Sequence, residues 1–131
     1  MDQANSITSD SKPCILVIEE SRIFCSILSR VLESQGFRVA KVFSLDRALE
    51  EIARDCPDVV VLSLTRFRGE GVSMLSVLKE AYSELPLIVL GFQEDSRLSL
   101  ECMRLGAADF LLLPLDLEDL IKSISRLISD K

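Results

Sequence analysis

The chain has 131 residues, 48% of them apolar, which is enough for one domain with its own buried core. It contains no His, so a His general base and His-ligated metal sites are excluded. There are 15 Lys and Arg against 21 Asp and Glu, and this net charge of −6 weighs against a nucleic-acid-binding surface.

The first part of the chain lacks targeting signals. Residues 1–12 are polar and lack the apolar stretch of a signal peptide, and no apolar run reaches the roughly 18 residues of a membrane helix. We therefore expect a disordered lead-in over residues 1–12, one domain over residues 13–131, and a cytoplasmic location.

The cysteines show no metal-binding or dithiol spacing, because no two form a C-x-x-C pair. Each lies in or beside an apolar run, so we expect buried free thiols in a reducing compartment. They are Cys14, Cys25, Cys56 and Cys102.

Strand and helix patterns alternate from Pro13 onward. Short apolar runs predict strands at 14–18, 37–43, 59–64, 87–90 and 108–113. Amphipathic helices follow each strand. Their predicted N-caps include Ser21, Ser44, Asp95 and Asp116, and Gly36 and Gly106 end two of them.

The third helix is predicted to follow a loop that contains Gly69 and Gly71. Five β-α units of this kind predict an α/β fold, a doubly wound parallel sheet with helices on both faces. Ligands of such sheets bind at the carboxyl ends of the strands. At those ends stand Glu19, Glu20, Ser63, Gly91 and Leu113.

Five segments of the chain, by their order and spacing, resemble the response-regulator receiver (CheY-like) domain. They are residues 15–20, 57–64, 69–71, 86–90 and 106–114, within a resemblance that covers about residues 12–129. The resemblance implies a five-stranded sheet in the order 2-1-3-4-5, as in the flavodoxin and CheY-like folds. It also implies a phosphoacceptor Asp, acidic Mg²⁺ ligands, a Thr or Ser, and a Lys.

The sequence departs from that pattern at nearly every position. Ser63 stands at the acceptor position, Gly91 at the hydroxyl position and Leu113 at the Lys position. The acidic pair is present as Glu19 and Glu20. The switching aromatic position holds Phe110, which has no hydroxyl.

These replacements predict a vestigial phosphorylation pocket. A Ser hydroxyl is not ionised at neutral pH, and no His is present to activate Ser63. Without the Lys, Glu19 and Glu20 would repel phosphate. We expect these two carboxylates to be solvated or paired with Arg66 or Arg68, with weak Mg²⁺ binding at Glu20 as the alternative.

Leu113 is expected to turn toward apolar neighbours or to cover the pocket. The resemblance implies a cis Leu113-Pro114 bond. Two regions could contact partners. The first is the loop of Arg66, Phe67 and Arg68. The second is the face made by the fourth helix, the fifth strand and the fifth helix, with Leu98, Met103, Phe110, Leu112 and Leu115.

The predicted function is a pseudo-receiver of a two-component phosphorelay, which accepts no phosphate and needs no cofactor. It would be a phosphorylation-independent protein-interaction module and not an enzyme. Expected partners are a signalling protein, an output domain or a second copy, and neither nucleic acid nor membrane. The alternatives are an atypical active receiver with weak Mg²⁺ binding, or a small-ligand-binding α/β domain, although the latter lacks a Gly-rich phosphate loop after the first strand.

Overall fold

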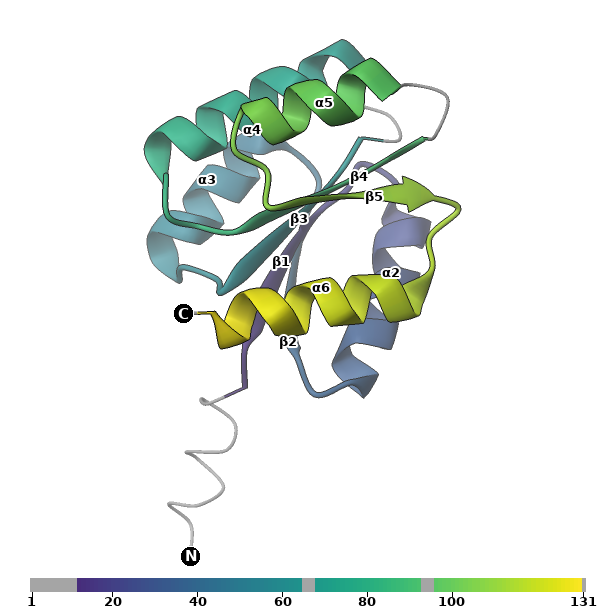
Figure 1. The fold of residues 1–131 in the computed structure, drawn as a ribbon. Coiled ribbons are helices and arrows are strands. Elements are labelled where there is room, and N and C mark those ends of the chain that lie inside the picture. Colours follow the sequence, from purple (N-terminus) through teal and green to yellow (C-terminus); the bar gives the residue numbers. More distant parts are fainter. Residues whose placement is uncertain (1–11, 65–67, 93–95, 131) are drawn as a thin grey trace, which may run out of the picture.

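Strands and helices alternate along the whole described chain (Figure 1). The computed structural model describes residues 12–64, 68–92 and 96–130. The elements are β1 (Cys14–Ile18), α2 (Arg22–Ser34), β2 (Arg38–Val42), α3 (Leu45–Arg54), β3 (Val59–Ser63), α4 (Arg68–Ala81), β4 (Leu87–Phe92), α5 (Ser96–Arg104), β5 (Asp109–Leu113) and α6 (Leu117–Ser129). Residues 1–11 of the predicted lead-in and the predicted cap Asp95 lie outside the described residues.

The strands form one parallel sheet in the order β2-β1-β3-β4-β5. Helices α2 and α6 cover one face of the sheet, and α3, α4 and α5 cover the other (Figure 1). The predicted doubly wound fold and its strand order are confirmed. The strand order reverses direction between β1 and β3, which puts the carboxyl ends of these two strands at the switch point.

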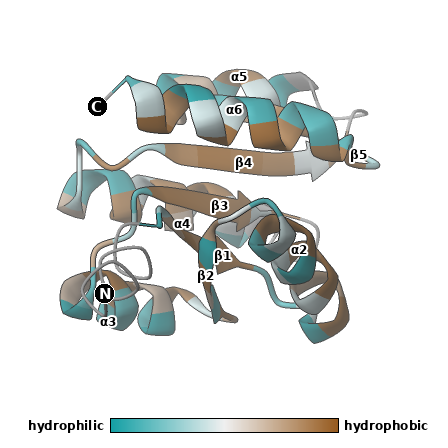
Figure 2. Cartoon of the chain, turned by 90° about the horizontal axis from the view of Figure 1, so that it is seen from below, coloured by the Kyte–Doolittle hydropathy of each residue, from teal (hydrophilic) through white to brown (hydrophobic). Residues whose placement is uncertain are grey.

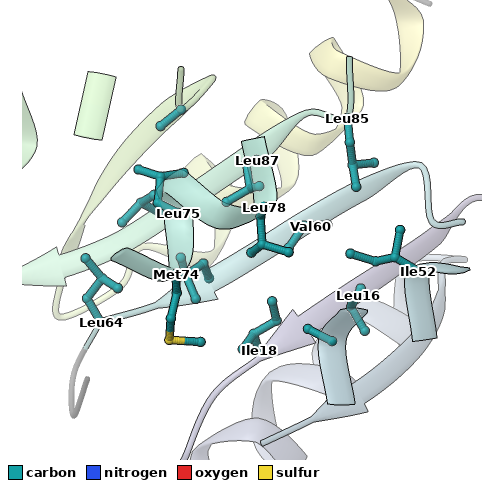
Figure 3. Packing of buried hydrophobic residues seen from close by; sticks show 14 of the residues in the cluster. Leu16, Ile18, Ile52, Val60, Leu64, Met74, Leu75, Leu78, Leu85 and Leu87 are labelled. Atoms are coloured by element: carbon teal, nitrogen blue, oxygen red, sulfur yellow. The ribbon is translucent and has the colours of Figure 1, made fainter. Parts of the chain in front are cut away.

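Side chains of β3 alternate between two apolar clusters because successive residues of a strand point to opposite faces. Val60 and Leu62 pack toward α3, α4 and α5 with the residues shown in Figure 3. Val59 and Val61 pack toward α2 and α6. Figure 2 shows how hydrophobic β3 and β4 are along their length, as expected of strands covered on both faces.

Three predicted N-caps are confirmed. The hydroxyl of Ser21 accepts a hydrogen bond from the backbone N–H of Phe24, and that of Ser44 accepts one from Arg47, both at 3.3 Å. The carboxylate of Asp116 accepts the N–H groups of the first turn of α6. These caps satisfy helix N–H groups that have no partner within the helix.

The loop predicted around Gly69 and Gly71 is wrong, because α4 already begins at Arg68 and includes both glycines. A Cβ atom at Gly71 would collide with Cδ2 of Leu64. This glycine therefore lets the first turn of α4 approach the end of β3. The sequence pattern favoured a loop because glycine is unfavourable inside a helix when no such contact is considered.

The cysteine prediction is confirmed for three residues and wrong for one. Cys14, Cys25 and Cys102 are buried free thiols, whereas Cys56 is exposed. Cys56 lies between the end of α3 and the start of β3, where the chain runs over the surface. In the described part of the chain no helix is long and apolar enough to cross a membrane.

Candidate functional site

The residues predicted at the strand ends lie at one edge of the sheet. In the register, Ile18 of β1 is beside Leu62 of β3, and Ser63 is beside Leu90 of β4. Gly91 is in turn beside Leu112 of β5. The ends of β1, β3, β4 and β5 therefore bring the predicted site positions together.

Glu19 and Glu20 differ completely in their surroundings. Glu19 is fully buried, and its Oε2 accepts the backbone N–H of Ser21 at 2.7 Å, at the N-terminus of α2. Helix N-termini favour such a negative charge. The expectation that Glu19 is solvated is therefore wrong, because this carboxylate is enclosed in the turn that begins α2. The alternative, a pair with Arg66 or Arg68, involves side chains outside the described residues.

Glu20 is exposed, as expected of a solvated carboxylate. It lines an open groove of about 440 Å³ together with Glu70 of α4. Among the described residues, no group of three or more Asp, Glu, Cys or His side chains could hold a metal ion. Glu20 and Glu70 supply oxygen ligands, but two such groups are few for a hard cation such as Mg²⁺.

Ser63 is fully buried at the end of β3. It stands two residues after Val61, so its side chain is on the same side of the sheet, the side of α2 and α6. In the described part of the chain, no buried side-chain oxygen or nitrogen lacks a hydrogen-bond partner. Ser63 therefore has a hydrogen-bonded hydroxyl in a packed environment.

Gly91 lies beneath the ring of Phe110. A Cβ atom built on Gly91 would stand 2.5 Å from Cζ of that ring. Phe110 is partly buried and packs against the cluster on the α3, α4 and α5 side. The ring therefore takes the space that a Ser or Thr side chain at position 91 would need.

Leu113 packs into the apolar cluster on the α2 and α6 side, with only 7% of its surface exposed. Its neighbours in that cluster include Leu120 and Ile124 of α6. This is the first of the two expected placements, in which Leu113 turns toward apolar neighbours. The Leu113-Pro114 bond is cis, as the resemblance implied.

The five residues expected on one interaction face separate in the structure. Met103 of α5 and Leu112 of β5 are exposed, at 44% and 45%. Leu98 and Phe110 pack against the core beneath α5, and Leu115 packs against the cluster on the opposite side of the sheet. The partial burial of Leu98, Phe110 and Leu115 follows from their position over the sheet, which helical spacing alone does not reveal.

Leu100 was not predicted from the sequence as a surface residue, and it is 58% exposed on α5, one turn before Met103. The sequence indicated this exposure only by placing Leu100 outside the helix face that carries Leu98 and Cys102. Arg66 and Phe67, predicted as loop contacts, lie outside the described residues. Arg68 is the first residue of α4 and not part of a loop.

Asp109 at the start of β5 was also missed as a functional candidate, although it is part of the motif at 106–114. Its Oδ2 accepts a hydrogen bond from the hydroxyl of Ser123 at 2.8 Å and lies 3.7 Å from Nη2 of Arg126. Its Oδ1 accepts the backbone N–H of Phe110 at 2.9 Å. Asp109 therefore ties the strand that carries Phe110 to α6.

The site contains few reactive groups at its strand ends. Ser63 offers one buried hydroxyl, Gly91 has no side chain, and the side chain of Leu113 is apolar. Neither a carboxylate nor a cation stands at these three positions. Such a set favours packing over group transfer, because phosphoryl transfer depends on charge placed where the phosphoryl group binds.

Comparisons with known proteins agree with this fold. The sequence model described as response regulator receiver domain matches residues 15–125. The transcriptional regulatory protein ZraR of Escherichia coli is 25% identical over 88% of this chain, and the match spans 26% of ZraR. The chain thus spans about a quarter of that relative.

Two further similar proteins are matched over nearly their whole length. The two-component response regulator ORR5 of Oryza sativa is 28% identical, over 96% of each chain. The receiver domain of NtrX from Brucella abortus superposes with a TM-score of 0.82 at 25% identity, over 89% of this chain and 99% of that one.

Proposed function

Because the chain belongs to the response regulator receiver domain family, we propose that it is a pseudo-receiver, a receiver domain that accepts no phosphoryl group. It acts instead in two-component signalling as a phosphorylation-independent interaction module. The family membership concerns the receiver fold and its place in signalling. The loss of phosphorylation is argued from the residues at the strand ends.

The observation that carries this proposal is the set of three residues at the ends of β3, β4 and β5, which are Ser63, Gly91 and Leu113. Ser63 has a buried neutral hydroxyl in place of an ionised carboxylate. The Phe110 ring stands over Gly91, and Leu113 is packed into an apolar cluster. A transferred phosphoryl group would meet no nucleophilic carboxylate and no cation at these positions, so its charge would not be offset.

Phosphorylation is tested with acetyl phosphate and phosphoramidate in the presence of Mg²⁺, followed by intact-mass spectrometry. We expect no species heavier by one phosphoryl group. A phosphorylated species would contradict the proposal. Hydroxylamine would then show whether the phosphate is on a carboxylate, which hydroxylamine cleaves, or on the hydroxyl of Ser63, which it does not.

Two variants make the negative result interpretable. Ser63→Asp alone supplies the carboxylate but leaves Leu113 in place, so we expect little or no phosphorylation. Ser63→Asp combined with Leu113→Lys supplies both charges, and we expect phosphorylation to increase. If the Ser63→Ala variant and the natural chain are phosphorylated equally at another residue, Ser63 is excluded as the acceptor.

Mg²⁺ binding is expected to be weak. The exposed carboxylates of Glu20 and Glu70 share a groove, whereas Glu19 is buried in the turn at α2. When Mg²⁺ is titrated into the protein, the amide chemical shift of Glu20 should therefore change only at millimolar Mg²⁺. Tight binding at this loop would support the alternative of an atypical active receiver.

The proposed interaction surface is formed by α5, β5 and α6. Its exposed apolar residues are Leu100, Met103 and Leu112, and Leu112 is on the same side of the sheet as Phe110. Exposed large apolar side chains are typical of surfaces that contact protein when they form one patch. The partner is a signalling protein, an output domain or a second copy of the chain.

This surface is tested with the double variant Leu100→Glu and Leu112→Glu. Its matched control is Ile23→Glu on α2, since Ile23 is 76% exposed on the other side of the sheet. Affinity capture from the source cell and sedimentation of the purified chain should both lose a complex in the double variant but not in the control. Equal complexes in all three proteins would contradict the proposed surface.

A further inference from the structure

The outer edge of β2 presents backbone groups that are not used by the sheet. The backbone N–H of Arg38 donates to the carbonyl of Pro13, and the carbonyl of Val42 accepts from Glu19, so these β2 residues face β1. Alternate residues of a strand direct their N–H and C=O groups to opposite sides. Val39 and Lys41 therefore direct theirs to the outer edge, where no strand pairs among the described residues.

Two hollows extend along this edge. One, of about 560 Å³, is lined by residues 41–43 of the strand region, by Arg22 of α2, and by Arg47 and Arg54 of α3. The other, also about 560 Å³, is lined by residues 37–40 and again by Arg54. Helices α2 and α3 cover opposite faces of the sheet on either side of β2 (Figure 1 and Figure 2). Because the linings combine residues of β2 with residues of these two helices, the two hollows lie along the open edge of β2.

The lining is positively charged on an acidic protein. The two hollows are lined by six Lys and Arg side chains and four Asp and Glu, whereas the whole chain has 15 and 21. The six are Lys12, Arg22, Arg38, Lys41, Arg47 and Arg54.

These cations are able to reach a partner. The pairs of Arg47 with Glu50 and Arg54 with Glu51 have arginines that are 75% and 73% exposed. The pair of Arg47 and Glu50 is exposed on both sides and contributes little stability, so Arg47 can turn toward another carboxylate. Arg22 lies 4.1 Å above the ring of Phe43, which holds its charge at the end of the edge.

We propose that the edge of β2 binds an extended acidic segment of a partner protein as an added strand. Backbone hydrogen bonds to Val39 and Lys41 would provide the pairing, and the surrounding cations would select acidic side chains. Charged edges also protect sheets from aggregation. A second copy of β2 would bring its own Arg38 and Lys41, so the same charges that repel a copy attract an acidic strand.

The proposal is tested on the full chain with a seven-residue peptide that alternates Glu and Val and has blocked ends. We expect binding that weakens as salt is added, with chemical-shift changes and slowed hydrogen exchange at the amides of Val39 and Lys41. A matched peptide that alternates Lys and Val should not bind. A Glu-Val peptide that is N-methylated at alternate residues, so that edge-facing amides are removed, should bind much more weakly.

The variant Lys41→Glu should weaken binding of the Glu-Val peptide by about fivefold or more, because an attractive cross-strand pair becomes a repulsive one. Its control is Lys122→Glu, the same charge change on an exposed residue of α6, which should leave the affinity unchanged. The N-methylated peptide tests the natural chain directly, so the proposal stays testable if Lys41→Glu does not fold.

Several outcomes would overturn the proposal. They are no shift at millimolar peptide, equal binding of the Lys-Val or N-methylated peptide, and protection of residues outside β2. A dimer of the free chain with protected Val39 and Lys41 would assign the edge to a second copy instead. Tighter binding of an oligothymidylate to the same amides would assign it to nucleic acid.

Discussion

The ring of Phe110 lies over the backbone of Gly91, and a Cβ atom at position 91 would stand 2.5 Å from Cζ of the ring. The two residues are on neighbouring strands, because Val89 of β4 is beside Phe110 of β5. The position of this ring therefore depends on the absence of a side chain at position 91. In the pseudo-receiver that we propose, the aromatic group is held inward without a phosphoryl group.

Gly91→Ala is expected to destabilise the chain by about 1–3 kcal/mol, because the added methyl group overpacks the ring of Phe110. The unfolding free energy from urea denaturation measures this. The same substitution should cost much less in a Phe110→Ala background, where the ring is absent. Equal costs in the two backgrounds would show that the contact between Gly91 and Phe110 is unimportant.

Asp109→Ala should lower the unfolding free energy by about 2–3 kcal/mol, since the carboxylate accepts hydrogen bonds from Ser123 and from the N–H of Phe110. Ser123→Ala should cost about 1 kcal/mol. Thermal or urea unfolding of both variants and of the double variant gives the coupling free energy between Asp109 and Ser123. Additive effects would argue against the link between β5 and α6.

Glu19→Ala should destabilise the chain by about 2 kcal/mol, because it leaves the N–H of Ser21 without its carboxylate partner. Glu20→Ala is the matched control on the adjacent, exposed residue, and its effect should stay within about 0.5 kcal/mol. Urea denaturation compares the two. A larger loss at Glu20 than at Glu19 would contradict the assignment of Glu19 to the turn at α2.

Only Cys56 should react rapidly with N-ethylmaleimide in the native chain, because the other three thiols are buried. Burial also raises the pKa of Cys14 and Cys25, which lowers their thiolate fraction further. Intact-mass spectrometry should show one added label at neutral pH. Cys56→Ser should abolish it, and rapid labelling of this variant would show that a second thiol is accessible.

Because the pKa of the Cys25 thiol is raised, the free energy of unfolding should depend on pH in the alkaline range. Burial is the main cause, and the negative charge of Glu19 raises the pKa as well. Above the ordinary thiol pKa of about 8.5, the unfolded chain loses protons that the folded chain keeps, so stability falls as pH rises. The slope of unfolding free energy against pH should be shallower in Cys25→Ala. An unchanged slope would exclude Cys25 as a contributor.

Local sequence patterns predicted the elements well because each depends on neighbours along the chain. The strand at Cys14–Ile18 and the caps Ser21, Ser44 and Asp116 were predicted and confirmed. The residue types at the strand ends, Ser63 and Leu113 among them, are likewise evident from the order of residues in the chain. That neither Ser63 nor Leu113 carries a charge follows directly from its residue type.

The predictions that failed depend on how the chain packs in three dimensions. Glu19 and Glu20 are adjacent and identical in type, yet only Glu19 is buried. The start of α4 depends on Leu64 reaching Gly71, and the exposure of Cys56 depends on the path of the chain between α3 and β3. No periodic pattern contains this information.

The sequence by itself determined the alternation of strands and helices and the absence of charged side chains at Ser63, Gly91 and Leu113, since periodicity and residue type are properties of the chain. Tertiary structure alone decided that the Phe110 ring stands over Gly91, that Glu19 is enclosed at α2, and that cations gather along the open edge of β2. The contact of Phe110 with Gly91 and the cations along β2 join residues far apart in the chain, and they exist only once the sheet has placed its strands side by side.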